Sequence, residues 1–227
     1  MKTLVAVLKL YRLPFVFTAV ADSAAGYLVG LGSLDPNAGT LALLALASAG
    51  LYAFGMAAND IADLERDRAS APQRVLPSGR LSPGTARAAA LGALGASAVA
   101  VILAPGRGAA PRILVWAAAA GAIVVYDFFL RASWVMGSVR ALNFLMGAAA
   151  TTANLKELAA PRETLHFAAL SFVYITALTA ISRQEDRKTL QTPAIYLAVA
   201  AMGTAAAWAA FLGPGISGAS SPARWLV

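Results

Sequence analysis

The side chains with the clearest chemical potential lie in the run Asn59-Asp60-Ile61-Ala62-Asp63-Leu64-Glu65-Arg66-Asp67-Arg68, directly after the uncharged apolar stretch 40–58. If a helix continues through this run, Asp60, Asp63 and Asp67 stand at i, i+3 and i+7 and share one face. Like charges on one face repel each other, so the helix gains nothing from them unaided. A divalent cation would reverse this effect, and Mg²⁺ prefers a few carboxylates together with phosphate oxygens. The run predicts a metal-bridged phosphate ester at the end of an apolar helix.

Arginines follow the aspartates at positions 68, 74 and 80. Arg68, Arg74 and Arg80 could form charge-assisted hydrogen bonds to a phosphate. They could also serve membrane topology alone. We expect the three aspartates to be exposed and to contribute little to packing.

Composition predicts a membrane protein with only α-helices. Of the 227 residues 59% are hydrophobic and 13% are charged, which is too apolar for a soluble domain of this length. Seven segments approach the roughly 20 residues that a membrane helix needs, and they are 13–33, 40–58, 88–104, 113–130, 133–154, 164–182 and 193–212. The runs lack the period-2 alternation of a β-barrel. Small residues such as Gly92 and Gly95 suggest close helix packing.

A net charge of +7 could indicate nucleic-acid binding, but the positions of the charges favour a membrane topology. With seven spans, most of the 18 basic residues fall on the side of the aspartate run, and only Arg107, Arg112, Lys156, Arg162 and Arg224 fall on the other. The positive-inside rule therefore places the aspartate run and the N-terminus in the cytoplasm. We expect the inner (plasma) membrane of a bacterial-type cell and no nucleic-acid partner. A cleaved signal peptide fits less well, because the first apolar run continues to Leu34. Cysteine is absent, which excludes disulfides and thiol chemistry.

Three polar segments fall on the same side of this topology, namely 59–87, 126–131 and 182–188. They hold most of the acidic residues of the chain. No linker divides the sequence, so we expect a single domain over 1–227. These segments should meet around one cavity that opens to the cytoplasm.

The pattern N-D-x-x-D-x-x-x-D-R at 59–68, followed by Gln73-Arg74-Val75-Leu76-Pro77-Ser78-Gly79-Arg80, resembles the signature of the UbiA superfamily of intramembrane aromatic prenyltransferases. Val75 stands where that family usually has proline. A second similarity comprises Tyr126-Asp127, Arg131, the stretch Gly137-Ser138-Val139-Arg140-Ala141-Leu142-Asn143, and Gly147. The resemblance covers nearly the whole chain and implies a UbiA-like helical bundle.

The chain departs from the family pattern at two places. The family's second aspartate motif is reduced to Ser182-Arg183-Gln184-Glu185-Asp186, which puts a second metal site in doubt. About seven spans are expected here, whereas the family typically has nine. The Ser182–Glu185 variant resembles the EboC-like branch of the family, as do Asp22 and the Gly137–Asn143 stretch.

The resemblance implies Mg²⁺-dependent transfer of a prenyl group from a polyprenyl (allylic) diphosphate to an aromatic or other lipophilic acceptor within the lipid bilayer. Its metal ligands would be Asn59, Asp60, Asp63, Asp67, Glu185 and Asp186. The catalytic groups would be Asp60, Asp63, Asp67 and Arg140. Substrate contacts would come from Arg12, Asp22, Asn59, Arg68, Arg74, Arg80, Tyr126, Asp127, Arg131, Asn143, Arg183 and Arg187.

Several alternatives stay open. Asp22 and Arg140 lie inside spans, where charged groups face a cavity or pair with each other. Tyr126 could instead be an interfacial anchor. The whole chain could be a non-catalytic protein that binds or transports a prenylated or aromatic metabolite. A secondary transporter would predict paired half-repeats, and the sequence has none.

Overall fold

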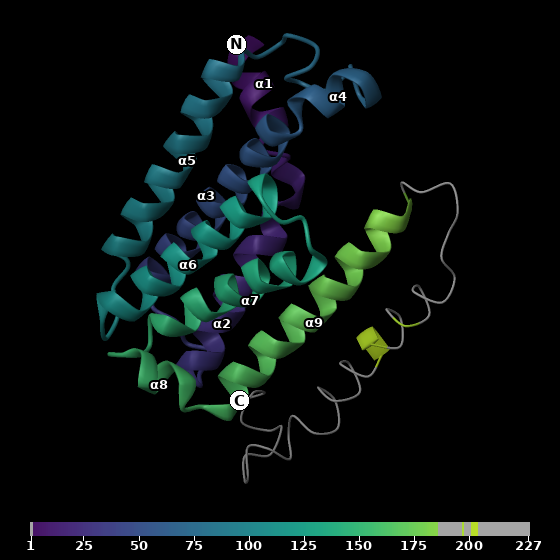
Figure 1. Cartoon of the computed structure of the whole chain (residues 1–227). Helices are drawn as coiled ribbons and strands as arrows, with labels where there is room; N and C mark the ends of the chain where they lie inside the picture. Colours follow the sequence, from purple (N-terminus) through teal and green to yellow (C-terminus); the bar gives the residue numbers. More distant parts are fainter. Residues whose placement is uncertain (1, 186–196, 198–200, 204–227) are drawn as a thin grey trace.

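The computed structural model describes residues 2–185, 197 and 201–203, and within these residues it contains helices and no strand. The helices, in order, are α1 (Lys2–Leu10), η1 (Leu13–Phe15), α2 (Val16–Leu31), α3 (Ala38–Ala62), α4 (Leu64–Ser70), α5 (Pro83–Leu103), α6 (Ala109–Phe128), α7 (Ser133–Ala149), α8 (Leu155–Ala159) and α9 (Arg162–Glu185). The all-α prediction is confirmed (Figure 1).

Six of the seven expected spans correspond to long helices that alternate in direction, namely α2, α3, α5, α6, α7 and α9 (Figure 1). Within the described residues, five stretches are long and apolar enough to cross a membrane: Thr3–Leu31, Ala38–Ala62, Pro83–Leu103, Ala109–Phe128 and Arg162–Ser182. Helix α7 has 17 residues and is therefore only about 25 Å long. The seventh expected span, 193–212, lies outside the described residues except for 197 and 201–203.

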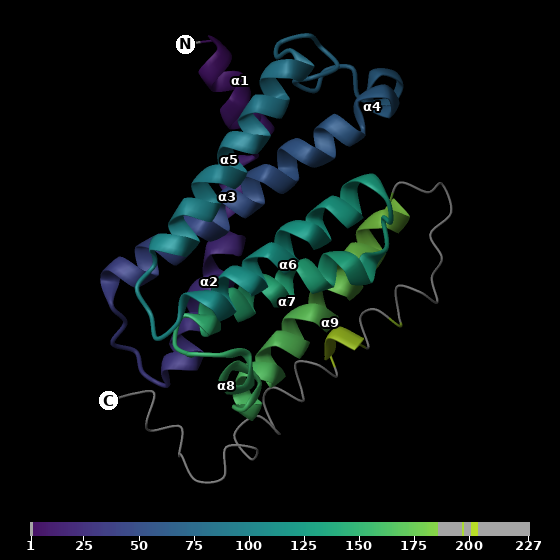
Figure 2. The same cartoon turned by 60° about the vertical axis from the view of Figure 1, so that its left-hand side comes forward.

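The helices form two groups that meet along α2 and α3. Helices α3 and α5 run side by side, and α7 packs against α2, α6 and α9 (Figure 2). Glycines allow the closest of these approaches: a Cβ on Gly147 would lie 1.9 Å from the Ser23 carbonyl oxygen, and one on Gly26 would lie 1.9 Å from that of Phe144. Small residues therefore bring the α2 and α7 backbones into contact.

The packing role expected for Gly92 and Gly95 is wrong. A Cβ at either position would meet no atom within 4 Å among the described residues. Both glycines are exposed on α5. The close contact between α3 and α5 lies instead at Gly50, where an added Cβ would be 2.7 Å from the Ser97 Cβ.

The segment 59–87 is more ordered than the expected long loop. Helix α3 continues to Ala62, and Asp63 separates it from α4 while its N–H still donates to the Asn59 carbonyl. Helix α5 begins with Pro83 at its first turn, and the Ser82 hydroxyl accepts a hydrogen bond from the Thr85 N–H. Both are common features of helix N-termini. The connection is thus confined to 71–82.

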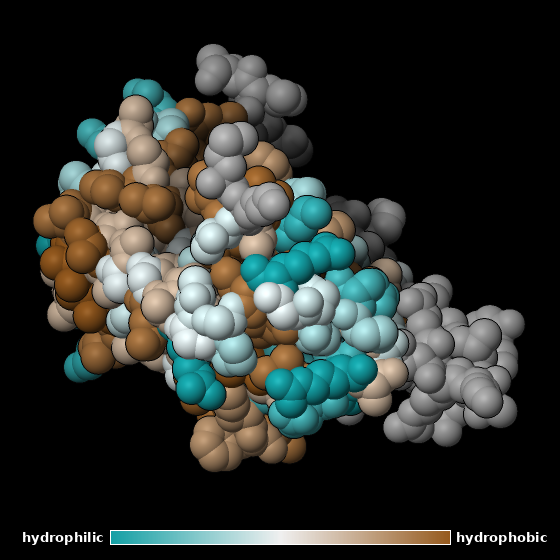
Figure 3. Space-filling model, turned by 90° about the horizontal axis from the view of Figure 1, so that it is seen from above, coloured by the Kyte–Doolittle hydropathy of each residue, from teal (hydrophilic) through white to brown (hydrophobic). Residues whose placement is uncertain are grey.

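Large apolar side chains cover much of the outer surface. Phe17 is 72% exposed and Leu91 is 66% exposed, as expected where lipid replaces water. At the end that carries α1 and α4, hydrophilic residues gather beside this apolar surface (Figure 3). Helix α9 runs from the α8 end of the molecule in the direction of α4, and its last turn stops below α4 (Figure 1). These features identify an integral membrane protein.

Candidate functional site

The aspartate cluster, defined as Asp60, Asp63 and Asp67, is buried rather than exposed. The relative exposures of these residues are 7%, 4% and 2%. The expectation of exposed carboxylates is wrong because each of them is paired with arginine. Removing an ionised carboxylate from water is unfavourable, and a paired cation offsets that loss of hydration.

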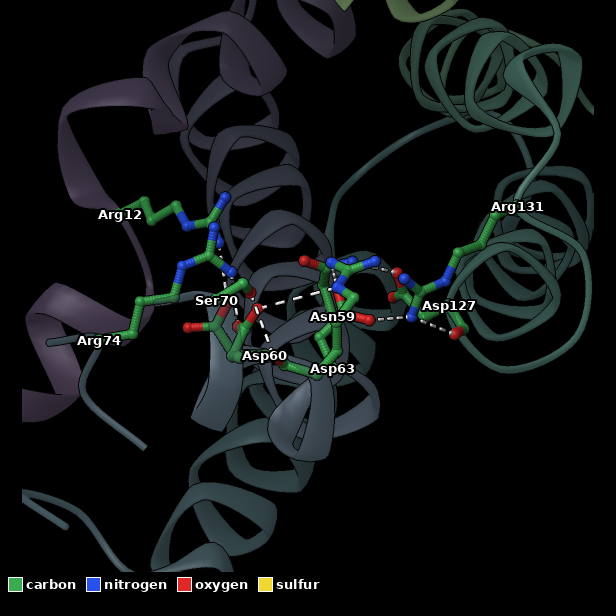
Figure 4. A network of polar contacts seen from close by, with 10 residues as sticks. Arg12, Asn59, Asp60, Asp63, Ser70, Arg74, Asp127 and Arg131 are labelled. Carbon is green, nitrogen blue, oxygen red and sulfur yellow. Dashed lines mark hydrogen bonds and ion pairs between the residues drawn. The ribbon is translucent and has the colours of Figure 1, made fainter. Parts of the chain in front are cut away.

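Each aspartate takes a cation from a different part of the chain. Asp60 pairs with Arg12 at 2.7 Å and Asp67 pairs with Arg74 at 2.6 Å, while Asp63 pairs with Arg131. Arg12 and Arg74 approach the cluster from one side and Arg131 approaches from the other (Figure 4). The cluster therefore joins the segment before α2, the 71–82 connection and the α6–α7 turn.

Arg66 is a further partner that the sequence-based prediction missed. It contacts Asp63, and its Nε lies 3.9 Å from Asp67. The position i+3 from Asp63 on a helix could have revealed the first contact.

Arg12 has a backbone conformation that non-glycine residues rarely adopt. Its φ is 48° and its ψ is 47°, in the left-handed region. The Arg12 carbonyl accepts a hydrogen bond from the Tyr52 hydroxyl at 3.4 Å, and the Arg12 guanidinium donates to Asp60. Strain of this kind persists where the surroundings hold a residue at a functional site.

The charge of the cluster reaches Arg74, which lies outside the spans. Burial lowers the pKa of Arg74, but its hydrogen bond to Asp67 and the charges of Asp67, Asp60 and Asp63 raise the pKa by more. The net shift is upward, so the guanidinium stays charged at any physiological pH.

A pocket of about 290 Å³ lies next to the cluster, between α2, α3, α6 and α7. Its mouth is formed by Arg12, Asn59, Tyr126 and Asp127, and the Asn59 amide donates to the Asp127 carboxylate at 3.2 Å. The residues that line it are Arg12, Ala19, Ser48, Leu51, Tyr52, Gly55, Met56, Asn59, Ala119, Ile123, Tyr126, Asp127, Met136, Val139, Arg140 and Asn143. The pocket is thus polar at the mouth and apolar in the middle.

The pocket is polar again at its deep end. Ser48 lies 11 residues before Asn59 on α3, which is about 16 Å along the helix. The Ser48 hydroxyl lies 2.7 Å from the Ala19 carbonyl and 2.9 Å from Asn143 Oδ1, and the Asn143 amide donates to the same carbonyl at 2.7 Å. Arg140 lies beside them, and its Nε is 2.8 Å from Asp22 Oδ2. The structure therefore forms the pair that the sequence left as one alternative.

Most of the predicted site residues converge on the cluster and the pocket, but Arg68 and Arg80 do not. Arg68 pairs with Glu65 on the exposed side of α4, and Arg80 is exposed in the connection. The side chains of Arg183 and Glu185, and all of Asp186 and Arg187, lie outside the described residues.

The sequence-based prediction also missed Ser48, Tyr52 and Met56, which line the pocket. Ser48 was detectable as a hydroxyl inside an apolar run. Tyr52 and Met56 carried no such signal.

The described residues contain no group of three or more His, Cys, Asp and Glu side chains arranged to hold a metal ion. The aspartates instead face their arginines. The chemistry of the donor set still suits Mg²⁺, because it consists of carboxylate and amide oxygens. If the arginines turned to an anionic ligand, the carboxylate oxygens that now accept their hydrogen bonds would become available to a metal ion.

Comparison with known proteins identifies the family. The sequence model of the UbiA prenyltransferase family matches residues 16–227. No curated protein matches the chain.

Among solved structures, the apo UbiA homologue from Aeropyrum pernix K1 is similar with a TM-score of 0.72 and 20% identity, over 91% of this chain and 80% of that one. A digeranylgeranylglyceryl phosphate synthase structure is similar with a TM-score of 0.71 and 18% identity, over 93% of this chain and 79% of that one. A UbiA homologue from Archaeoglobus fulgidus bound to GPP and Mg²⁺ has a TM-score of 0.67 and 16% identity, over 96% of this chain and 80% of that one. These structures share the fold, and the family match covers most of the sequence. The chain belongs to the UbiA prenyltransferase family.

Proposed function

We propose that the protein transfers a prenyl group from an allylic diphosphate to a lipophilic acceptor inside the membrane. The observation that carries the proposal is the aspartate cluster and its arginines at the mouth of an otherwise apolar pocket. Family membership supports the reaction class. An anionic diphosphate suits the mouth, and a hydrocarbon chain suits the middle of the pocket.

Arg12, Arg74 and Arg131 are the proposed diphosphate contacts. Each is already within hydrogen-bond distance of a carboxylate, and each can exchange that partner for a phosphate oxygen. Arg66, which also pairs with Asp63, would turn to the diphosphate with them, and Asp60, Asp63 and Asp67, with Asn59, would then be free to hold Mg²⁺. When bound, the ion would neutralise the diphosphate and make it a better leaving group.

Glu185 and Asp186 stay the proposed ligands of a second ion. With fewer carboxylates, such a site would depend more on water and substrate oxygens, so we expect it to be weaker. Arg183 and Arg187 remain proposed donor contacts beside it.

The reaction breaks the C–O bond of the donor, and its electron pair leaves with the diphosphate. Leu51, Met56, Ile123 and Val139 line the apolar middle of the pocket and would keep water from the allylic cation. A nucleophilic carbon of the acceptor attacks the cation and then loses its proton to the released diphosphate. The tail of a long donor would leave between helices into the lipid, with the cluster facing the cytoplasm.

A transfer assay with matched variants tests this function. The purified protein in detergent micelles is mixed with GPP, Mg²⁺ and a lipid extract as the source of acceptor, and diphosphate release and prenylated products are followed by mass spectrometry. Asp63→Asn removes a buried carboxylate of the cluster and should lower the rate at least ~100-fold, the scale typical of lost charge stabilisation. Glu65→Gln is the control, because Glu65 is exposed and pairs only with Arg68 among the described residues.

Full turnover in Asp63→Asn would contradict the assigned role of the cluster. Binding of GPP without diphosphate release by the wild type, with every extract, would favour the non-catalytic binding protein instead. Comparison of lipid extracts from cells with and without the protein would then identify what it carries.

A further inference from the structure

The deep end of the pocket holds a charge pair that the chemistry at the mouth does not use. Asp22 on α2 and Arg140 on α7 form this floor pair, with side-chain exposures of 19% and 16%. Arg140 also donates to the Thr18 carbonyl at 2.8 Å. Arg140 lines the pocket, whereas Asp22 lies behind it and contacts it.

The floor differs from the mouth in how strongly its arginine can attract an anion. At the mouth, several arginines surround several carboxylates, and substrate and metal can exchange partners there. At the floor one cation meets one anion, so the pair is neutral overall. An anionic group placed against Arg140 would also face Asp22, and the second negative charge would offset much of the attraction in a site of low dielectric constant.

The remaining groups of the floor are uncharged hydrogen-bonding groups. The Ser48 hydroxyl and the Asn143 amide lie on the pocket lining and contact one backbone carbonyl, that of Ala19. These groups already bond to one another, but the oxygens of Ser48 and Asn143 can each accept a further hydrogen bond. A donor hydrocarbon cannot supply that hydrogen bond, whereas a hydroxyl group can. The polar floor therefore suits the acceptor rather than the prenyl chain.

We infer that the acceptor is an uncharged lipophilic molecule whose hydroxyl or carbonyl group binds at the floor, and that Asp22 sets this preference by neutralising Arg140. The inference rests on the proposed function, since it assigns the second substrate of the same pocket. Asp22 is a positioning residue that acts through Arg140.

Two probes that differ in charge test the inference. They are 6-hydroxy-2-naphthalenemethanol, which is neutral, and 6-hydroxy-2-naphthoate, which is anionic. Binding of each to the full-length protein in a non-ionic detergent is measured by titration calorimetry, with Mg²⁺ and the non-reacting geranyl S-thiolodiphosphate present. The wild type should bind the alcohol at least about tenfold more tightly than the carboxylate.

Asp22→Asn keeps the size of the side chain but leaves Arg140 without its counter-charge. Relative to the wild type, the affinity for the carboxylate divided by the affinity for the alcohol should rise by at least about tenfold. Asp35→Asn is the matched control, because Asp35 is exposed in the connection between α2 and α3 and changes the net charge equally. If Asp22→Asn fails to fold, the double variant Asp22→Asn/Arg140→Gln, which has no charge at the floor, should keep the wild-type preference for the alcohol.

A wild type that prefers the carboxylate, or that binds neither probe, overturns the inference. An affinity ratio unchanged by Asp22→Asn in a folded protein also overturns it. These measurements need no turnover, so they are independent of the proposed reaction: the expected ratios without release of diphosphate from GPP would support the acceptor site and contradict the transferase.

Discussion

Replacing Gly147 by alanine should destabilise the protein, because this glycine permits the contact between α7 and α2. A Cβ at Gly147 would lie 1.9 Å from the Ser23 carbonyl oxygen and 2.9 Å from the Tyr27 nitrogen, whereas ordinary contacts begin at 3.4 Å. The helices would have to separate by up to about 1.5 Å, and the atoms in the way are backbone atoms that cannot rotate aside.

The magnitude follows from two opposing effects. Overpacking typically costs about 1–3 kcal/mol, and a contact this short belongs at the upper end. Alanine in a helix recovers about 1 kcal/mol relative to glycine. The net loss of about 2 kcal/mol corresponds to a fall in melting temperature of roughly 4–8 °C for a chain of this size.

Thermal unfolding in detergent, followed by circular dichroism, measures the effect. Gly92→Ala is the matched control, because its Cβ would meet no atom within 4 Å among the described residues. Its melting temperature should be unchanged or higher. A Gly147→Ala variant as stable as the control would refute the view that backbone contact joins α2 and α7. Since the same contact brings Asp22 to Arg140, Gly147→Ala should also weaken acceptor binding.

Three further outcomes are expected. Arg112→Leu should lower the free energy of unfolding by about 1–3 kcal/mol, because the buried guanidinium donates to the Val101 carbonyl in the last turn of α5 at 2.9 Å; an unchanged melting temperature would contradict this. Ser48→Ala should raise the KM for the acceptor and leave that for GPP unchanged, because it removes the hydroxyl beside Asn143; an equal change in both would contradict its place at the floor. Arg12→Gly should be more stable than Arg12→Ala by about 1 kcal/mol, since only glycine adopts φ 48° without strain; equal stabilities, measured by thermal unfolding, would mean that the backbone relaxes.

The sequence by itself determined the class of the fold and the position of the cluster. Hydrophobicity is a property of each segment, so long apolar runs identify spans before any contact is known. Six of the seven expected spans match helices, and residues 59–67 lie where α3 emerges from the apolar region. The N-D-x-x-D-x-x-x-D-R pattern at 59–68, with the segment 73–80 that follows it, also pointed to the family correctly, because its residues are close together in the chain.

Only the tertiary structure decided what the charged residues contact and how far they are buried. Local spacing placed Asp60, Asp63 and Asp67 on one face, but their partners Arg12 and Arg131 come from other elements. The contact faces of helices depend on their rotation about their own axes, which is why Gly147 joins α2 and α7 while Gly92 faces away from its neighbours. The same rotation turned Asp22 toward Arg140 and Ser48 toward the pocket. Because pairing is what makes a buried charge tolerable, the character of the pocket floor was set by packing between distant helices and could not be read from any one segment.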